Sequence, residues 1–497
     1  MNAAYPTLES RFRRIALLSE AAGVLHWDAA AIMPKGGAAA RGEQLAEIKT
    51  VVHGLMTEPD TGELIADAEA GAGELDEWQC ANLREIRHRW IKATAVPEAL
   101  VTRLSLACTA CETAWRHARP AADFAAIKPL LQEVLTLTRE AGQAKAEASG
   151  LSLYDALLDD FEPGGRSADI DVVFGELEAS LPDFLAEALE AQAARPTPEM
   201  PQGPFPVAKQ KALGQRFMQA LGFDFHHGRL DVSLHPFCGG IPEDVRITTR
   251  YDEGDFTSSL MGVLHETGHA LYERGLPERW RRQPVGEALG MSIHESQSLL
   301  IEMQVCRSRA FIEWATPLMR EAFDGKGAAW EIENLYRLYT RVTPDFIRVD
   351  ADEVTYPAHV ILRYRLEKNL LEGNMSLGDL PAAWNDGMKA LLGITPPSDR
   401  EGCLQDLHWY DGAWGYFPTY TLGAMTAAQL FAAAGDEDPA IGAGIAKGEF
   451  GPLMAWLGRN VHGQARLMYA PDLLTRVTGR PLDPKVFETH LRRRYLG

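Results

Sequence analysis

The stretch Leu264-His265-Glu266-Thr267-Gly268-His269-Ala270 decides how the rest of the chain is interpreted. On a helix, residues four positions apart lie one turn apart on the same face, so His265 and His269 can direct their imidazoles toward one point. Converging imidazoles are typical of a metal site, and Glu266 lies where its carboxylate can reach a water on that metal. We therefore predict that this turn supplies two metal ligands, His265 and His269, and a general base, Glu266.

The residues around this turn favour a helix. Thr257 or Ser258 is the expected N-cap, and Gly275 followed by Pro277 is a stop signal. A His-Glu-x-x-His string also arises by chance, so the metal site needs support from other segments of the chain.

A third metal ligand must come from another segment, because catalytic zinc takes three protein ligands and keeps one position open for water. Glu295 is our first choice, since it lies far enough downstream for a second helix to pack beside the first. Glu287 and Glu302 are alternatives, and His294 is expected to point away from Glu295. Asp352 and Glu302 are the alternatives for the acid that hydrogen-bonds a ligating His.

These motifs resemble the carboxypeptidase Taq family of metallocarboxypeptidases. The resemblance begins with 265–269 and continues in His294-Glu295-Ser296-Gln297, the motif that carries the third metal ligand in that family. Further motifs of the family occur in order along nearly the whole chain: Trp27-Asp28, Met33-Pro34, His235-Pro236-Phe237, Asp244-Val245-Arg246-Ile247-Thr248, Ile347-Arg348-Val349-Asp350-Ala351-Asp352 and Gly402-Cys403-Leu404-Gln405-Asp406-Leu407-His408-Trp409.

The resemblance implies a metal-dependent carboxypeptidase of broad specificity that removes residues one at a time from the C-termini of peptides. It also implies a homodimer and a Zn²⁺ cofactor that Co²⁺ can replace. Two alternatives stay open: a metallo-oligopeptidase that cuts internally or releases dipeptides, and a peptide-binding protein that contains a metal. Glu266 argues against the second alternative, because a purely structural site has no need of a base.

Recognition of a substrate C-terminus requires a group that binds a free carboxylate, and Arg does this with a planar pair of donors. Arg348 is our first choice and Arg246 the second. The alternative is that each Arg only forms an ion pair with a nearby acid: Asp350, Asp352 or Asp244.

Donors to the developing oxyanion are expected in the aromatic-rich run 408–420. His408 is the preferred residue, followed by Tyr420. For Tyr420 the alternative is core packing, with the hydroxyl satisfied locally.

Composition limits the classes of partner. The chain has 497 residues, 46% hydrophobic and 24% charged, and a net charge of −20, which disfavours nucleic acid and anionic membranes. We find neither a signal peptide in the stretch that begins at Met1 nor an apolar run of about 18 residues. The six cysteines are scattered. These features favour a cytoplasmic protein with reduced thiols.

The spacing of apolar residues predicts a mainly α, large multi-helix fold. Helices are expected at 8–31, 41–56, 74–92, 97–119, 124–149, 171–194, 207–221, 356–371 and 380–392. Alternating patterns at 229–234 and 244–251 predict two strands around a Gly239-Gly240 turn, and 346–349 can add a third strand. We expect this small β-sheet beside a deep active-site groove and a zincin-type helix.

The domain prediction is a single metallocarboxypeptidase domain over 1–497, with helical halves flanking the groove. The proline-rich segment 195–206 is the one internal boundary that the composition indicates. The preferred C-terminal residue, the peptide length limit and the physiological substrate do not follow from the sequence.

Overall fold

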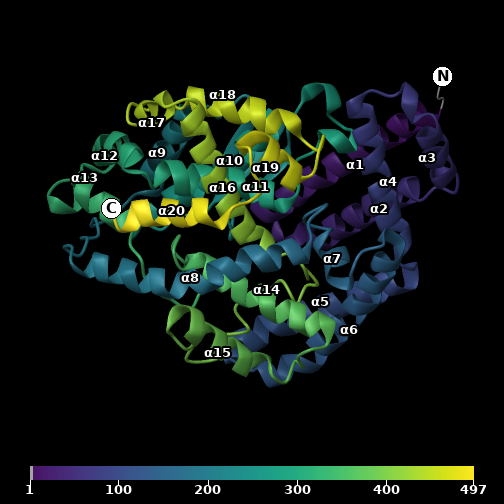
Figure 1. Cartoon of the computed structure of the whole chain (residues 1–497), viewed down its shortest axis with the longest axis horizontal. Coiled ribbons are helices and arrows are strands. Elements are labelled where there is room, and N and C mark those ends of the chain that lie inside the picture. The colour runs from purple at the N-terminus through teal and green to yellow at the C-terminus, as the bar shows by residue number, and fades with distance from the viewer. Residues whose placement is uncertain (1–3) are drawn as a thin grey trace.

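The computed structural model describes residues 4–497, so residues 1–3 of the N-terminal stretch considered above lie outside the described part. Figure 1 shows a molecule built almost entirely of helices, with the N-terminal helices gathered at one end, at the upper right of the view. None of the described helices combines the length and apolar character needed to cross a membrane.

The first half of the chain is a succession of helices, as the apolar spacing predicts. Each predicted helix is present, with ends within a few residues of those expected, and α3 and α7 are additional. The helices are α1 (Ala4–Ala31), α2 (Ala38–Met56), α3 (Thr61–Ala70), α4 (Glu77–Ala95), α5 (Glu98–Ala121), α6 (Phe124–Ser149), α7 (Leu153–Leu158), α8 (Ser167–Ala193) and α9 (Val207–Ala220).

The second half is also mainly helical after a short β region. It includes a π-helix, η5 (Leu300–Cys306), and a 3₁₀ helix, η7 (Arg348–Asp350). Its α-helices are α10 (Phe256–Gly275), α11 (Met291–Leu299), α12 (Arg309–Phe323), α13 (Ile332–Tyr339), α14 (Tyr356–Glu372), α15 (Leu380–Leu392), α16 (Pro418–Glu437), α17 (Ala440–Ile445), α18 (Gly451–Asn460), α19 (Ala470–Thr478) and α20 (Pro484–Tyr495).

Helix α6 illustrates how local chemistry sets these bounds. The Asp123 side chain caps the first turn by accepting a hydrogen bond from the Ala126 N–H at 2.9 Å. Gly150 ends the helix in the left-handed region, with φ of 74°. Between them, Ile127, Leu131 and other residues at spacings of three and four are buried, so one face of α6 packs into the core.

The sheet has three strands, β1 (Gly228–Val232), β2 (Phe237–Ile241) and β3 (Asp244–Thr249), in the order β1-β3-β2. β1 pairs with β3 in parallel, and β2 pairs with β3 in antiparallel. The predicted hairpin around Gly239-Gly240 is therefore wrong, because these glycines lie inside β2. The expected first strand reaches β3 as a parallel neighbour instead.

The predicted strand at 346–349 is also wrong, since Arg348 begins the 3₁₀ helix η7. The backbone N–H of Arg348 donates to Gln405 Oε1 at 2.9 Å, and its side chain points into the protein toward Asp406. Val349 is 71% exposed. Tertiary contacts of a buried Arg thus override the local β preference.

The core is divided unevenly. One large cluster of buried apolar side chains draws residues from Leu100 to Tyr495, and α10, α11 and α16 run through it. A smaller cluster joins α1, α2, α3 and α4. In Figure 1, α10, α11 and α16 overlap in the upper centre, while α8, α14 and α15 lie below them. α10 also packs against β3, so the small sheet lies beside the predicted metal helix.

The proline-rich segment 195–206 is attached to the rest of the chain. The backbone N–H of Glu199 donates to Asn334 Oδ1 at 2.8 Å, and the N–H of Phe205 donates to the Glu253 carbonyl at 2.8 Å. These contacts hold the segment against two distant parts of the sequence.

Candidate active site

Helix α10 carries both predicted imidazole ligands and the predicted base. The side chain of Asp255 caps it by accepting from the Thr257 N–H at 2.8 Å, so Asp255, and not Thr257 or Ser258, is the N-cap. The helix ends at Gly275, as the stop signal predicts. His269 and Glu266 are buried within it.

Two glycines allow the neighbouring helices to approach. A Cβ on Gly268 would lie 2.5 Å from the Gln297 carbonyl oxygen, so α10 and α11 meet backbone to backbone at this point. A Cβ on Gly423 of α16 would lie 2.8 Å from the Cβ of Glu295. Glu295 on α11 is therefore enclosed between α10 and α16.

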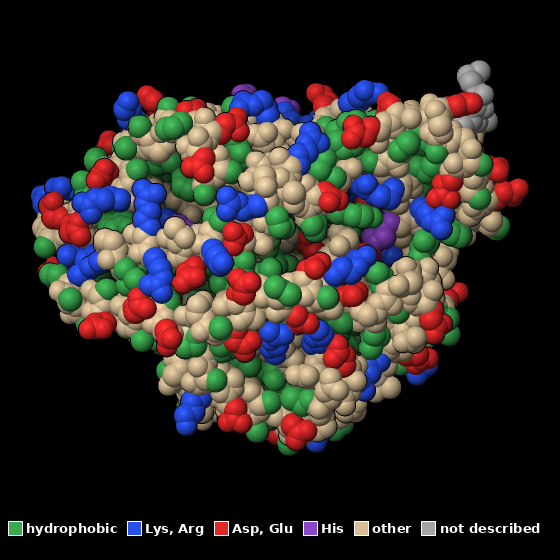
Figure 2. Space-filling model, viewed as in Figure 1, with side chains coloured by type: hydrophobic (Ala, Val, Ile, Leu, Met, Phe, Trp, Pro, Cys, Tyr) green, Lys and Arg blue, Asp and Glu red, His purple; other side chains and the backbone are tan. Residues whose placement is uncertain are grey.

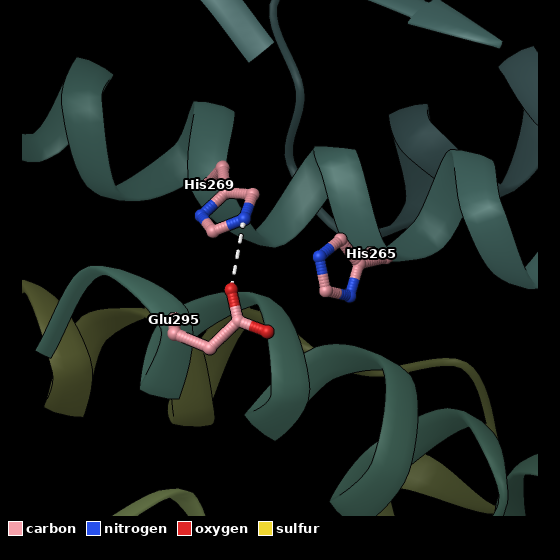
Figure 3. Close-up of side chains that lie close together, drawn as sticks. All are labelled: His265, His269 and Glu295. Carbon is pink, nitrogen blue, oxygen red and sulfur yellow. Dashed lines mark ion pairs between the residues drawn. The ribbon is translucent and has the colours of Figure 1, made fainter. Parts of the chain in front are cut away.

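The three predicted ligands come together. The nitrogen and carboxylate oxygen atoms that His265, His269 and Glu295 offer all lie within 4.8 Å of one another. Figure 3 shows both imidazoles on one helix and the Glu295 carboxylate facing them from the next, with His269 Nε2 3.6 Å from Glu295 Oε2. Two imidazoles and one carboxylate are a donor set that catalytic zinc sites use, with the fourth position left to water.

Glu302 is not one of these three residues, but it forms a hydrogen bond with one of them, His265. Its Oε2 is 2.9 Å from His265 Nδ1, and its Oε1 accepts from Arg307 Nη2 at 2.6 Å. An acid on Nδ1 leaves Nε2 of the same ring to face a metal ion. Glu302 lies on the π-helix η5, a distortion that proteins often place at functional sites.

Glu287, His294 and Asp352 each have partners of their own, outside the three ligands. Glu287 pairs with Arg89, and His294 Nε2 lies 2.9 Å from Glu273 Oε1. The ring of His294 packs on that of His269, with centroids 4.5 Å apart. Asp352 accepts backbone hydrogen bonds from Thr343, Val354 and Thr355.

The pKa values of Glu266 and His269 are shifted by burial and by their charged neighbours. Burial raises the pKa of Glu266 to about 7, with His265 lowering it and Glu295 raising it. Oε2 of Glu266 is buried without a hydrogen-bond partner among residues 4–497. Burial, together with His294 and His265, lowers the pKa of His269 well below its ordinary value, so its imidazole is neutral. A neutral imidazole is the form that binds a metal.

A second group of charges lies around Arg348, which is 5% exposed. Its Nε and Nη2 donate to Asp406 Oδ1 at 3.0 and 2.9 Å. Arg363 of α14 donates from Nε to the other oxygen of Asp406 at 2.6 Å. Asp406 thus holds two buried guanidinium groups. Sequence reasoning gave it no role, although it lies two residues before His408 in the motif 402–409; an acid in such a motif is the signal that could have found it.

His408 and Tyr420 belong to this second group. His408 Nε2 is 3.0 Å from the Tyr420 hydroxyl, and the Arg348 guanidinium lies 4.6 Å from the centre of the Tyr420 ring. Burial lowers the pKa of His408 to about 4, with Asp406 opposing and Arg348 adding to the shift. Burial raises the pKa of Tyr420 to about 12, with Arg348 opposing and Glu295 adding to the shift. The Tyr420 hydroxyl is therefore a neutral donor near Glu295.

Arg246 has a different setting. It lies on β3, forms an ion pair with Asp244, and packs its guanidinium 4.5 Å from the centre of the Trp27 ring. Trp27 is buried and also contacts Arg229, at 5.0 Å. Neither contact involves the Arg348 group.

Known proteins resemble this chain over its whole length. The family model "Carboxypeptidase Taq (M32) metallopeptidase" matches residues 7–495. Thermostable carboxypeptidase 1 of Thermus thermophilus is 37% identical, with 99% of this chain and 98% of the relative covered. Carboxypeptidase 1 of Bacillus subtilis is 35% identical over 97% and 96%.

Solved structures agree in fold. Metallocarboxypeptidase 1 of Trypanosoma cruzi superposes with a TM-score of 0.98 at 42% identity over 100% of both chains. The M32 carboxypeptidase of Deinococcus radiodurans has a TM-score of 0.93 at 34% identity, over 99% of this chain and 98% of its own. The chain therefore belongs to the carboxypeptidase Taq (M32) family of metallopeptidases and is a metal-dependent carboxypeptidase.

Proposed function

We propose that the protein is a zinc carboxypeptidase of broad specificity that releases single residues from the C-termini of peptides. His265, His269 and Glu295 would hold the ion, and Glu266 would act as the general base. The observation that carries this assignment is the convergence of three ligand atoms within 4.8 Å beside the buried carboxylate of Glu266, which lacks a protein partner among the described residues.

A bound zinc ion would supply Lewis acidity, lowering the pKa of water and polarising the scissile carbonyl. Glu266 takes a proton from the attacking water and passes it to the leaving amine. Burial supports both transfers, since a carboxyl pKa of about 7 lets the group accept and release a proton near neutral pH. Glu302 fixes the ring of His265 through Nδ1.

Arg348 binds the free carboxylate of the substrate. Asp406 accepts hydrogen bonds from Nε and Nη2 of this guanidinium and so fixes the orientation of its plane. Because Arg363 also pairs with Asp406, the three side chains together carry a net positive charge. Tyr420 donates its neutral hydroxyl to the developing oxyanion, and His408 positions that hydroxyl from 3.0 Å. Arg246, which pairs with Asp244 and packs on Trp27, is the second candidate for binding the substrate carboxylate.

Mass spectrometry of an N-terminally blocked peptide tests this function. The zinc-loaded enzyme should produce a ladder that shortens by one C-terminal residue at a time, and chelator-treated enzyme should leave the peptide intact. A peptide with a C-terminal amide is the matched control, because it lacks the carboxylate that Arg348 binds. Internal cuts, or equal cleavage of the amide, would contradict the assignment.

The metal itself needs a separate measurement. We propose Zn²⁺, with Co²⁺ able to replace it, because the donor set combines two neutral imidazoles with one carboxylate. Elemental analysis of the purified protein should find one zinc per chain, and cobalt added to the metal-free enzyme should restore cleavage. Stoichiometric iron or manganese with full activity would contradict the zinc proposal.

We further propose a homodimer, a cytoplasmic location and one domain over 1–497. The resemblance to the family supports the dimer, which light scattering tests. Free cysteines, including the exposed Cys80, support a reducing compartment. The contacts of 195–206 support one domain with two helical halves, and cooperative unfolding in a single transition is the expected result.

A further inference from the structure

A cavity of about 330 Å³ lies away from the metal-binding residues. It is open to solvent on one side and is lined by the second half of α4, the end of α6, the loop 159–166 that follows α7, and Tyr469 at the start of α19. Figure 2 shows Lys and Arg side chains around a histidine on the face between α4 and α7. The volume is at the lower end of the range typical of small-molecule sites.

Basic side chains outnumber acidic ones in the lining of this cavity, although the chain as a whole carries a charge of −20. A single acid, Asp159, lines it. The basic side chains are Arg84, Arg87, His88, Lys92, Lys145 and Arg166. Gathering like charges destabilises a fold unless other groups offset their repulsion.

Acids in and around the cavity pair with five of these six side chains, including Arg84 with Glu85 and His88 with Asp159. Lys92 Nζ lies 2.9 Å from Asp160 Oδ1 and donates to the Asp159 carbonyl at 2.8 Å. Lys145 Nζ is 2.5 Å from Asp160 Oδ2, and Arg87 pairs with Glu69. Neither Asp160 nor Glu69 lines the cavity. The ammonium groups are therefore ordered before a ligand arrives.

Arg166 differs from its neighbours. Within residues 4–497 it forms no ion pair, and its hydrogen bond goes from Nη1 to the Gly165 carbonyl at 2.7 Å. Its other guanidinium N–H groups are available to a ligand in the cavity. An Arg with donors to spare, next to fixed ammonium groups, is typical of sites for phosphate or similar oxyanions.

We propose that this cavity binds a small free anion of the phosphate type, with Arg166 and Arg87 as its principal contacts and Lys92 and Lys145 supplying fixed charge. The cavity is too small for a macromolecule, and its cations converge from three elements, which suits a compact anion with several oxygens. Nothing in the proposed peptidase mechanism uses these residues, so binding does not depend on that mechanism.

The loop that forms one wall of the cavity also supports the helix that carries Glu295. The Phe161 carbonyl accepts from the Met291 N–H at 2.8 Å, and the Glu162 carboxylate accepts from the N–H and hydroxyl of Ser292 at 2.8 and 2.7 Å. Both contacts fix the first turn of α11. An anion that orders 159–166 through Arg166 is therefore linked to the position of Glu295.

Phosphorus NMR of inorganic phosphate, titrated with the zinc-loaded protein at constant ionic strength, tests the proposal. Saturable line broadening is expected with the wild type. Arg166→Ala should raise the dissociation constant for phosphate roughly tenfold. Arg87→Ala should raise this dissociation constant by a smaller factor. Arg103→Ala is the matched control, since Arg103 is an exposed cation on α5 that pairs with Glu140 outside the cavity.

The affinities of the three variants distinguish support for the phosphate site from its rejection. Unchanged binding in Arg103→Ala together with weakened binding in both cavity variants would support the site. Absence of saturable binding in the wild type, or equal affinity in Arg166→Ala and Arg103→Ala, would overturn it. If the metal ion alone held the phosphate, Arg166→Ala and Arg103→Ala would bind it equally well, which would overturn the proposal. In that case a chelator would abolish phosphate binding, whereas Arg166→Ala would not.

Discussion

The proposed metal-binding group and the Arg348 group influence each other electrostatically but differ in their ratio of acids to Arg residues. Around His265 and His269, three acids, Glu266, Glu295 and Glu302, lie near one buried Arg, Arg307. Around Asp406 the ratio is reversed, with one carboxylate between Arg348 and Arg363. The first group therefore contains more acids than Arg residues, and the second contains more Arg residues than acids.

This difference supports the roles that we propose for the two groups. Buried charges are stable only when they are compensated, so a metal cation would complete the first group and an anion such as a substrate carboxylate would complete the second. Hydrolysis near a C-terminus needs both at once, since the scissile carbonyl and the terminal carboxylate are one residue apart. The following predictions test each side of the comparison, beginning with the largest effect.

Glu266→Gln should lower kcat by roughly 10²–10⁴-fold, because the amide cannot take the proton of the attacking water. Zinc content should not change, since Glu266 is outside the set of three ligands. Kinetics on a blocked peptide and elemental analysis measure the two quantities. Glu278→Gln, at an exposed acid just after α10, is the matched control. A variant with near-normal kcat would exclude Glu266 as the base.

Asp406→Asn should lower the free energy of unfolding by about 3–5 kcal/mol, since it leaves two buried guanidinium groups without their shared carboxylate. Chemical denaturation measures this change. Asp244→Asn removes the acid partner of the more exposed Arg246 and should cost well under half as much. Equal losses would mean that burial does not distinguish the two Arg residues.

Arg348→Ala should lower kcat/KM for a free-acid peptide by a factor on the order of 10², through the loss of a buried contact to the terminal carboxylate. Arg348→Lys should recover only part of this, because an ammonium group cannot bind a carboxylate with two parallel hydrogen bonds. Arg246→Ala is expected to have the smaller effect. If Arg246→Ala were the more damaging variant, the carboxylate would bind at β3 and not beside Asp406.

Glu302→Gln should weaken zinc binding by about 10–100-fold, because His265 loses the acid that orients its ring. Competition with a chelator of known affinity measures the change. Glu287→Gln is the control, as Glu287 pairs with Arg89 away from His265. Unaltered zinc affinity in Glu302→Gln would show that Arg307 and the π-helix are sufficient to hold the ring.

The smallest expected effect is a pH dependence of the stability of the fold, caused by ionisation of the buried Glu367. Burial raises its pKa to about 7, with Tyr154 and Trp409 opposing the shift as hydrogen-bond donors. The unfolded chain releases this proton near pH 4.5, before the folded chain does, so Glu367 costs stability as pH rises from about 4.5 through 7. The melting temperature of the wild type should therefore fall relative to Glu367→Gln between pH 5 and 8. Parallel curves for the two proteins would contradict this.

Much of the metal-binding group could be predicted because its members are close in sequence. The four-residue spacing of His265 and His269 determines that both lie on one helical face, and Glu266 follows from the same turn. Glu295 is preferred to Glu287 and Glu302 because it lies far enough downstream for a second helix to pack beside the first, and the family resemblance agrees with that choice. Only the packing of α11 against α10 at Gly268 places the carboxylate of Glu295, and not its rivals, beside both imidazoles.

The sequence by itself determined the helices, the turn with two imidazoles and a base, and the family, because each depends on spacing along a few residues or on ordered motifs. Only the tertiary structure decided the parallel pairing of β1 with β3, the 3₁₀ helix at Arg348 and the bridge from Asp406 to two Arg residues. These features join segments far apart in the chain, and local propensity carries no information about which distant charge or strand will complete a pair.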